Sequence, residues 1–153
     1  MRPRTISLRS KSIVNSIRDR IRQGDTKHKV ETPSGWRYGG EDFTKLVDSL
    51  QVEIDKDLQN DGIHVNIPSY HFPVGIYKVL ACTVRRFNKG EPILNPLYPT
   101  KRLIIIPVNG AASLSPGGSL SIDTYCFIEG IPTLSGEGID VVIVAYELKS
   151  LNA

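Results

Sequence analysis

Apolar residues recur with a helical period in the first sixty residues of the chain and with a period of two afterwards. Ile13, Ile17 and Ile21 follow one another at four-residue spacing, which predicts a short amphipathic helix over 12–23 that ends before Gly24. Phe43, Leu46, Val47 and Leu50 have i, i+3, i+4, i+7 spacing and predict a second helix to about residue 51, with its extension toward residue 58 left open.

From residue 61 onward, alternating and β-branched residues predict strands separated by glycine- and proline-rich turns. The expected strands cover 63–67, 74–86, 101–108, 119–129 and 138–149, and a further short strand is expected around 29–31. The centre of 101–108 is continuously apolar, so both faces of that strand should be covered. The pattern predicts an α+β fold, with two helices packed on one side of an antiparallel sheet or flattened barrel of about five strands.

The 153 residues suit a single domain, and we expect two parts in it. Residues 1–24 are predicted to be a basic arm, mobile over 1–10 and helical after that, and residues 25–153 a globular β-rich domain. A helix this short needs a surface to pack against. For the stripe of Ile13, Ile17 and Ile21, that surface is the chain's own core, a neighbouring subunit in self-association, or a membrane.

Positive charge is concentrated at the N-terminal end. Residues 1–40 hold ten Lys or Arg against three acidic residues, a balance of +7, whereas the remainder has nine basic and thirteen acidic residues, a balance of −4. Clustered cations attract the phosphates of lipid headgroups or nucleic acid. The predicted anion-binding residues are Arg2, Arg4, Arg9, Lys11, Arg18, Arg20 and Arg22, with a second patch of Arg85, Arg86, Lys101 and Arg102 if their strands are neighbours.

No stretch of the sequence has the spacing of an active site. His28, His64 and His71 are the only histidines, and no third ligand at a recognised spacing joins them, so no metal site is predicted. The glycine-rich segment 116–118 joins two strands and lacks the lysine of a phosphate-binding loop. We therefore expect no catalytic residue, no cofactor and no enzyme activity.

The remaining sequence signals concern the chain's environment. Cys82 and Cys126 lie in apolar strand-like runs, which indicates reduced thiols that pack as small hydrophobic groups. No signal peptide is expected, because charged residues interrupt the apolar run 13–21. The longest apolar runs, such as 103–108, are too short for a transmembrane helix.

The order of elements between residues 34 and 109 resembles that of the rhabdovirus matrix proteins. The similar segments are Pro33-Ser34-Gly35-Trp36-Arg37-Tyr38, the helix Phe43–Leu50, the strand Ile76–Ala81 and Lys101-Arg102-Leu103-Ile104-Ile105. The chain departs from that family in its shorter length and in lacking the Pro-Pro-x-Tyr budding motif. This absence counts against a budding role.

The resemblance implies a non-enzymatic structural protein that self-associates, binds anionic membrane and the nucleocapsid, and resides in the virion and the host cytoplasm, peripheral to a membrane. A second hypothesis, from the charge alone, is a nucleic-acid-binding protein such as a small capsid protein or a single-strand binder with RNA as partner. Under either hypothesis, neutralising Arg18, Arg20 and Arg22 together should weaken anion binding and leave the fold intact.

Overall fold

A computed structural model describes residues 4–24, 28–32, 35–63, 76–88, 91–92, 101–110, 112–115, 118–128, 133–136 and 138–149. Two helices and eleven strands form in this part of the chain. In chain order, the elements are β1 (Arg4–Thr5), α1 (Leu8–Gln23), β2 (His28–Thr32), β3 (Gly35–Gly39), α2 (Glu41–Asn60), β4 (Ile76–Phe87), β5 (Glu91–Pro92), β6 (Lys101–Asn109), β7 (Ala112–Ser115), β8 (Gly118–Leu120), β9 (Thr124–Ile128), β10 (Thr133–Ser135) and β11 (Ile139–Lys149).

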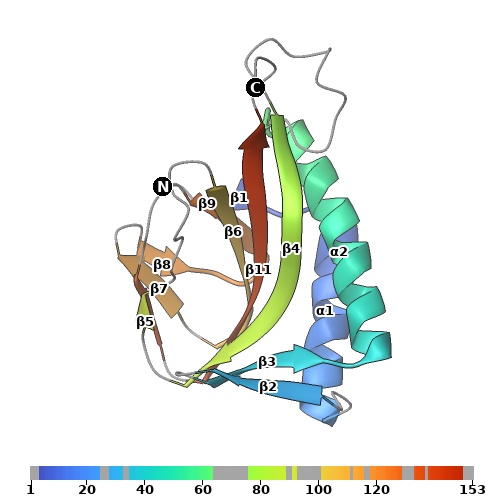
Figure 1. Cartoon of the computed structure of the whole chain (residues 1–153), viewed down its shortest axis with the longest axis vertical. Coiled ribbons are helices and arrows are strands. Elements are labelled where there is room, and N and C mark those ends of the chain that lie inside the picture. Colours follow the sequence, from blue (N-terminus) through green and yellow to red (C-terminus); the bar gives the residue numbers. More distant parts are fainter. Residues whose placement is uncertain are drawn as a thin grey trace.

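The strands form two antiparallel sheets. The larger sheet has the order β1-β9-β6-β11-β4-β3-β2 and the smaller one the order β5-β10-β7-β8. The smaller sheet faces one side of the larger sheet, and both helices cover the other side (Figure 1). The four strands β4, β11, β6 and β9, set against β5, β10, β7 and β8, have the strand order of an eight-stranded jelly roll.

The predicted α+β class, with two helices on one side of an antiparallel sheet, is confirmed. Two separate sheets take the place of a flattened barrel, and there are more strands than the five expected. The expected strand over 119–129 is broken at Asp123, whose φ of 69° is left-handed, into β8 and β9. Three segments predicted as loops contain the short strands β5, β7 and β10, and the strand expected over 63–67 lies largely outside the described residues.

The N-terminal segment is part of the folded body, so the prediction of a mobile tail over 1–10 is wrong for residues 4–10. Arg4 and Thr5 pair with β9 as an edge strand, and Ile6 is 2% exposed. Helix α1 then begins four residues earlier than predicted, because the Ser7 hydroxyl caps it by accepting from the backbone N–H of Ser10. Gly24, with a φ of 75°, ends the helix as predicted.

Helix α2 runs to Asn60, beyond the predicted end near residue 51, because Ile54 and Leu58 continue its buried stripe. Together with α1 it packs on one face of the larger sheet, where Ile104, Ile106 and Val108 of β6 are fully buried. Leu103 and Ile105 of the same strand face the smaller sheet and are also buried, which confirms that both faces of this strand are covered. Neither of the two helices is both long and apolar enough to span a membrane.

Candidate functional site

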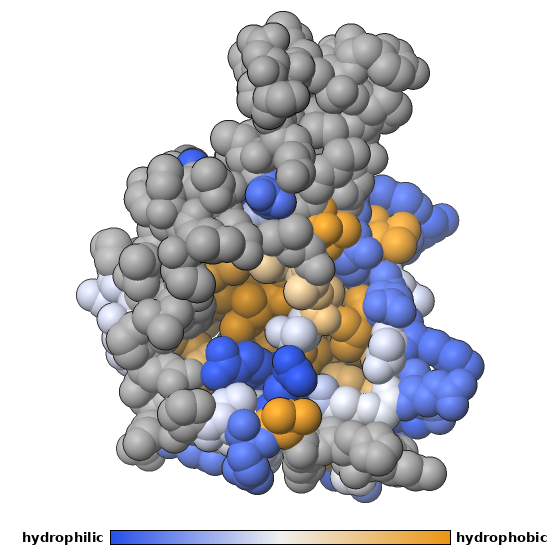
Figure 2. Space-filling view, viewed as in Figure 1, coloured by the Kyte–Doolittle hydropathy of each residue, from blue (hydrophilic) through white to orange (hydrophobic). Residues whose placement is uncertain are grey.

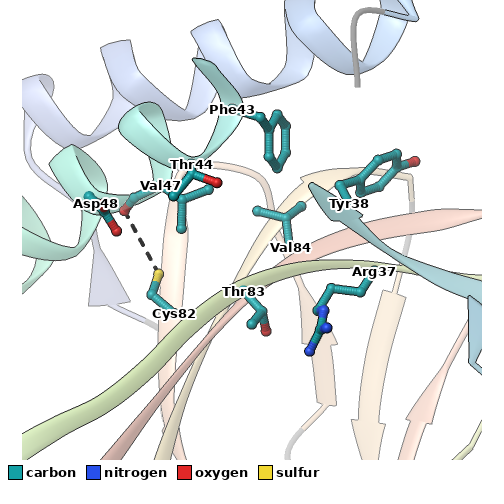
Figure 3. Close-up of a pocket in the computed structure, with 9 residues that line it drawn as sticks. All are labelled: Arg37, Tyr38, Phe43, Thr44, Val47, Asp48, Cys82, Thr83 and Val84. Carbon is teal, nitrogen blue, oxygen red and sulfur yellow. Dashed lines mark hydrogen bonds between the residues drawn. The ribbon is translucent and has the colours of Figure 1, made fainter. Parts of the chain in front are cut away.

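A pocket of about 170 Å³ lies at the point where β3 separates from β4 beneath α2. Strand β3 pairs with β4 only from Gly35 to Arg37, opposite Phe87 to Arg85. Beyond Arg37 the chain turns away toward Gly40 and enters α2, which leaves a gap between the two strands (Figure 3). The residues that line the pocket are Arg37, Tyr38, Phe43, Thr44, Val47, Asp48, Cys82, Thr83 and Val84.

The pocket has apolar walls between α2 and β4 and polar residues around them. Phe43 and Val47 come from successive turns of α2 and are buried, and Val84 faces them from β4. Thr44 and Asp48 lie beside them on the exposed side of the same helix. An engineered apolar cavity of about 150 Å³ binds benzene, so a pocket of this size has room for one ring or one branched aliphatic group.

A buried polar network fixes the Tyr38 wall of the pocket. The Tyr38 hydroxyl donates to the Asp140 carboxylate at 2.7 Å, and Asp140 is 1% exposed. The same carboxylate lies 3.2 Å from the Arg86 Nε and accepts from the Asn109 amide at 3.2 Å. Burial, and then the hydrogen bond and charge of Asp140, raise the pKa of Tyr38 well above its usual value of 10. Tyr38 is therefore neutral at physiological pH.

Cys82 lies at the pocket but is not an activated nucleophile. Its Sγ lies 3.9 Å from the Val47 carbonyl oxygen, to which it donates (Figure 3). Burial, followed by the negative charges of Asp48 and Asp55, raises the pKa of the Cys82 thiol to about 12. Because the thiolate is the reactive form, the thiol is unreactive near neutral pH. Cys82 and Cys126 are both free, which confirms the expectation of reduced thiols.

The pocket adjoins a stretch of open sheet edge. Strand β4 pairs with β11 along its whole length, from Ile76 to Phe87. On its other side, only residues 85–87 pair with β3, so no described strand pairs with residues 76–84 along that edge. This edge of the larger sheet faces the viewer in Figure 1. Figure 2, from the same side, shows apolar surface in a hollow at the centre of this face, with hydrophilic residues below it and to its right.

The two faces of the sheet differ beside this edge. Cys82, Val84 and Tyr38 point toward α2, whereas Thr83 and Arg37 point to the opposite face (Figure 3). Arg37 is exposed and makes no hydrogen bond or ion pair with any described residue. In the pairing register it lies directly opposite Arg85, and two like charges at such positions repel each other.

The structure disperses the predicted anion-binding residues of the arm. Arg4 donates to the Asp61 backbone carbonyl at 3.0 Å, Arg18 donates to that of Val108 at 2.7 Å, and Arg20 lies 3.8 Å from the Asp42 carboxylate. Arg9 and Arg22 are exposed on α1, and Lys11 is half-buried. Arg2 lies outside the described residues. Several of these cations therefore bind groups within the chain, and anion binding by the others stays a prediction.

Arg18 has a structural role that the sequence did not reveal. Its Nε hydrogen bond to Val108 ties α1 to β6, and its second nitrogen donates to the Asn15 side chain at 2.6 Å. We expect Arg18→Ala to lower the free energy of unfolding by about 1–3 kcal/mol, the usual value for a hydrogen bond from a charged group. Arg22→Ala, at an exposed position of the same helix, should change it by less than about 0.5 kcal/mol in urea titrations. Equal values for the two variants would contradict this role.

The stripe predicted for self-association packs on the chain's own core. Ile17 is fully buried, and Ile13 and Ile21 are partly buried against the same cluster. Of the three surfaces considered for this helix, the structure has the intramolecular one. Self-association through Ile13 and Ile21 is untested, and Ile17 contributes no surface to it.

The second predicted patch does not form in one place. Strands β4 and β6 lie on opposite sides of β11, with Arg85 opposite Val141 and Arg102 opposite Tyr146. Five residues of strand separate these positions, roughly 17 Å at about 3.3 Å per residue. Arg86 binds the buried Asp140. The side chain of Lys101 is not among those that the structure describes. The patch was predicted on the condition that the strands were neighbours, and they are not.

The pocket and the network behind it were not predicted from the sequence. Tyr38 and Asp140 are 102 residues apart in the chain, and no local pattern joins them. One signal was available: Asp140 stands alone between Ile139 and a run of apolar residues in a strand. A single carboxylate in a buried strand needs a partner, and Arg86 was the candidate on the neighbouring strand.

No protein-family model matches the sequence, and no curated protein matches it. Solved structures do match the fold. The chain is similar to a viral collagen prolyl hydroxylase from Paramecium Bursaria Chlorella virus-1, solved as a 2OG complex, with a TM-score of 0.50 and 9% identity over 99% of this chain and 97% of that one. A Pseudomonas putida prolyl-4-hydroxylase matches with a TM-score of 0.48 and 9% identity over 97% of this chain and 91% of that one.

These matches contradict the expectation of a non-enzymatic, matrix-type protein. The fold that the chain shares with the viral protein is one that an enzyme uses. This likeness therefore corrects three expectations: the matrix-type function, its nucleic-acid-binding alternative, and the expectation of no enzyme activity. A jelly roll with helices packed on one face produces the same order of elements that suggested the matrix resemblance.

The residues that the structure describes do not fit the iron site of a hydroxylase. Non-haem iron oxygenases hold the metal with two histidines and one carboxylate. Residues 72–153 include all eight strands of the jelly roll and contain no histidine. His64 and His71 precede these strands and lie outside the described residues. Among described residues, no group of three His, Cys, Asp or Glu can hold a metal, and the space between the two sheets is filled by apolar side chains.

Proposed function

We propose that this chain binds an extended polypeptide, which adds as a strand to the open edge of β4 and places one side chain in the pocket beneath α2. The observation that carries the proposal is the combination of an edge without a described partner strand over residues 80–84 and a pocket beside Cys82–Val84. In strand addition, main-chain hydrogen bonds supply affinity and a side-chain pocket supplies specificity.

Two further observations support this function. The face that carries this edge shows apolar surface in a central hollow with hydrophilic residues beside it, a combination typical of a protein-binding surface (Figure 2). The viral protein of similar fold is named for its action on collagen, which is itself a polypeptide. We propose polypeptide binding as the property that the two proteins have in common.

A neutral peptide tests the proposal. The probe is a blocked heptapeptide of six threonines with a central leucine, added to the full chain labelled with ¹⁵N. We expect amide shifts and slowed hydrogen exchange within residues 80–84 of β4, because the added strand would pair with this part of the edge. The same peptide N-methylated at alternate residues should bind at least tenfold more weakly, since it lacks those donors.

A pair of variants locates the pocket. Thr44→Phe, at the exposed rim, should fill the pocket from outside and weaken peptide binding at least tenfold. Ser49→Phe adds the same side chain at an exposed position of α2 away from the pocket, and should bind the peptide as the unchanged chain does. The proposal fails if 1 mM peptide causes no shift in β4, or if the two variants bind alike.

A further inference from the structure

The side chains beside the open edge indicate what sequence the polypeptide carries. Successive side chains of a strand point to opposite faces of a sheet. A residue that fills the pocket beneath α2 therefore has neighbours that point to the other face. That face carries Thr83 and Arg37 at this level of the sheet (Figure 3).

Arg37 is suited to bind an anion there. Its guanidinium is exposed and has no hydrogen-bonding or ionic partner among the described residues. It stands directly across from Arg85, which lies 4.7 Å over the Phe87 ring. A carboxylate placed beside Arg37 would accept hydrogen bonds from its planar guanidinium.

The part of the pocket beneath α2 disfavours an acidic side chain, because the Arg37 side chain points away from it (Figure 3). Phe43, Val47 and Val84 supply an apolar interior, and an acidic side chain there would face the Asp48 carboxylate at the rim. The space of about 170 Å³ suits one leucine, isoleucine or phenylalanine side chain. Acidic and apolar preferences are therefore assigned to opposite faces of the same bound strand.

We infer that the polypeptide carries an apolar residue with an acidic residue directly beside it, the apolar side chain in the pocket beneath α2 and the carboxylate on Arg37. This inference rests on the proposed function, because it takes the peptide to be bound as a strand on the edge of β4. It adds a partner class, namely an acidic extended peptide, to that function.

Three matched peptides test the inference on the full chain by fluorescence anisotropy. They are the blocked threonine heptapeptide with central leucine and two versions in which both neighbours of the leucine are glutamate or lysine. We expect the glutamate peptide to bind about fivefold more tightly than the threonine peptide, and the lysine peptide more weakly than either, as a charge-assisted contact at an exposed site predicts. The glutamate preference should shrink in 0.5 M salt.

Variants at Arg37 assign the preference to this residue. The ratio of glutamate-peptide to threonine-peptide affinity should fall toward one in Arg37→Gln, persist in Arg37→Lys and invert toward the lysine peptide in Arg37→Glu. Arg22→Gln, which removes an exposed arginine of α1, should keep the ratio of the unchanged chain.

The outcomes separate the two proposals. If the three peptides bind with the same affinity, or if Arg37→Glu keeps the glutamate preference, the inference is overturned while strand addition stands. If none of the three peptides binds, the proposed function itself fails. An acidic preference that moves with the charge at position 37 supports both.

Discussion

Replacing Asp140 by alanine should destabilise the domain by about 3–5 kcal/mol, the cost of leaving one partner of a buried ion pair alone. The Asp140 carboxylate is 1% exposed and receives the Tyr38 hydroxyl, the Asn109 amide and the Arg86 Nε. The two hydrogen-bond donors, Tyr38 and Asn109, and the ion-pair partner Arg86 all lose the carboxylate in the variant. A loss of this size is a large part of the 5–15 kcal/mol that usually stabilises a domain. Urea unfolding followed by circular dichroism measures it.

Two variants separate the buried charge from a general effect of substitution. Asp19→Ala removes an exposed carboxylate from α1 and should change the free energy of unfolding by less than about 0.5 kcal/mol. The double variant Asp140→Leu with Arg86→Met removes both charges and should recover part of the loss, because an apolar pair avoids the cost of desolvating ions. A loss below about 1 kcal/mol in Asp140→Ala would show that the network contributes little.

The same network links stability to the proposed peptide site. Tyr38 is packed against Phe43, with ring centroids 5.8 Å apart, and its hydroxyl is held by Asp140. The position of the pocket wall therefore depends on a strand at the far end of the chain. Loss of Asp140 is expected to loosen the wall, so peptide binding should weaken in the same variant even at a temperature where the domain is folded.

The elements that could be predicted from the sequence are those whose periodicity is strong and local. Helix α2 and strands β4, β6 and β11 follow directly from apolar spacing. The short strands β7 and β10 have three or four residues each and lie among glycines, prolines and serines, so no period could indicate them, and β8 was merged with β9 in one predicted strand. Without them, the second sheet and hence the jelly roll could not be inferred.

The site could not be predicted because it depends on pairing. The pocket exists where β3 leaves β4 after Arg37, and the register of that pairing joins residues about fifty positions apart. The arm was misjudged for a related reason. Charge along a sequence does not show whether an arginine faces solvent or a carbonyl group, and Arg18 reaches Val108, 90 residues away.

Above pH 10, the domain should lose stability steeply, because three buried tyrosines resist ionisation in the folded state. Tyr38, Tyr125 and Tyr146 donate to Asp140, Asp61 and Asp55, respectively. Burial, and then these carboxylates, raise the pKa of each tyrosine well above its usual value of 10. The unfolded chain releases these protons near pH 10 and the folded chain keeps them. The contribution of these tyrosines to the free energy of unfolding is therefore constant below that pH. Above it, the free energy of unfolding falls by about 1.4 kcal/mol per tyrosine and pH unit.

By pH 11 the three tyrosines together should remove about 4 kcal/mol, with a further loss from Cys82, whose pKa of about 12 also exceeds its usual value of 9.0. Tyrosinate absorbance near 295 nm, recorded with circular dichroism, should show these three groups ionising only as the domain unfolds. Tyr146→Phe should remove one third of the tyrosine-dependent slope, although it costs about 1 kcal/mol at neutral pH by leaving Asp55 with one donor fewer. Ionisation of all six tyrosines near pH 10 in a chain that is still folded would contradict the buried pairs.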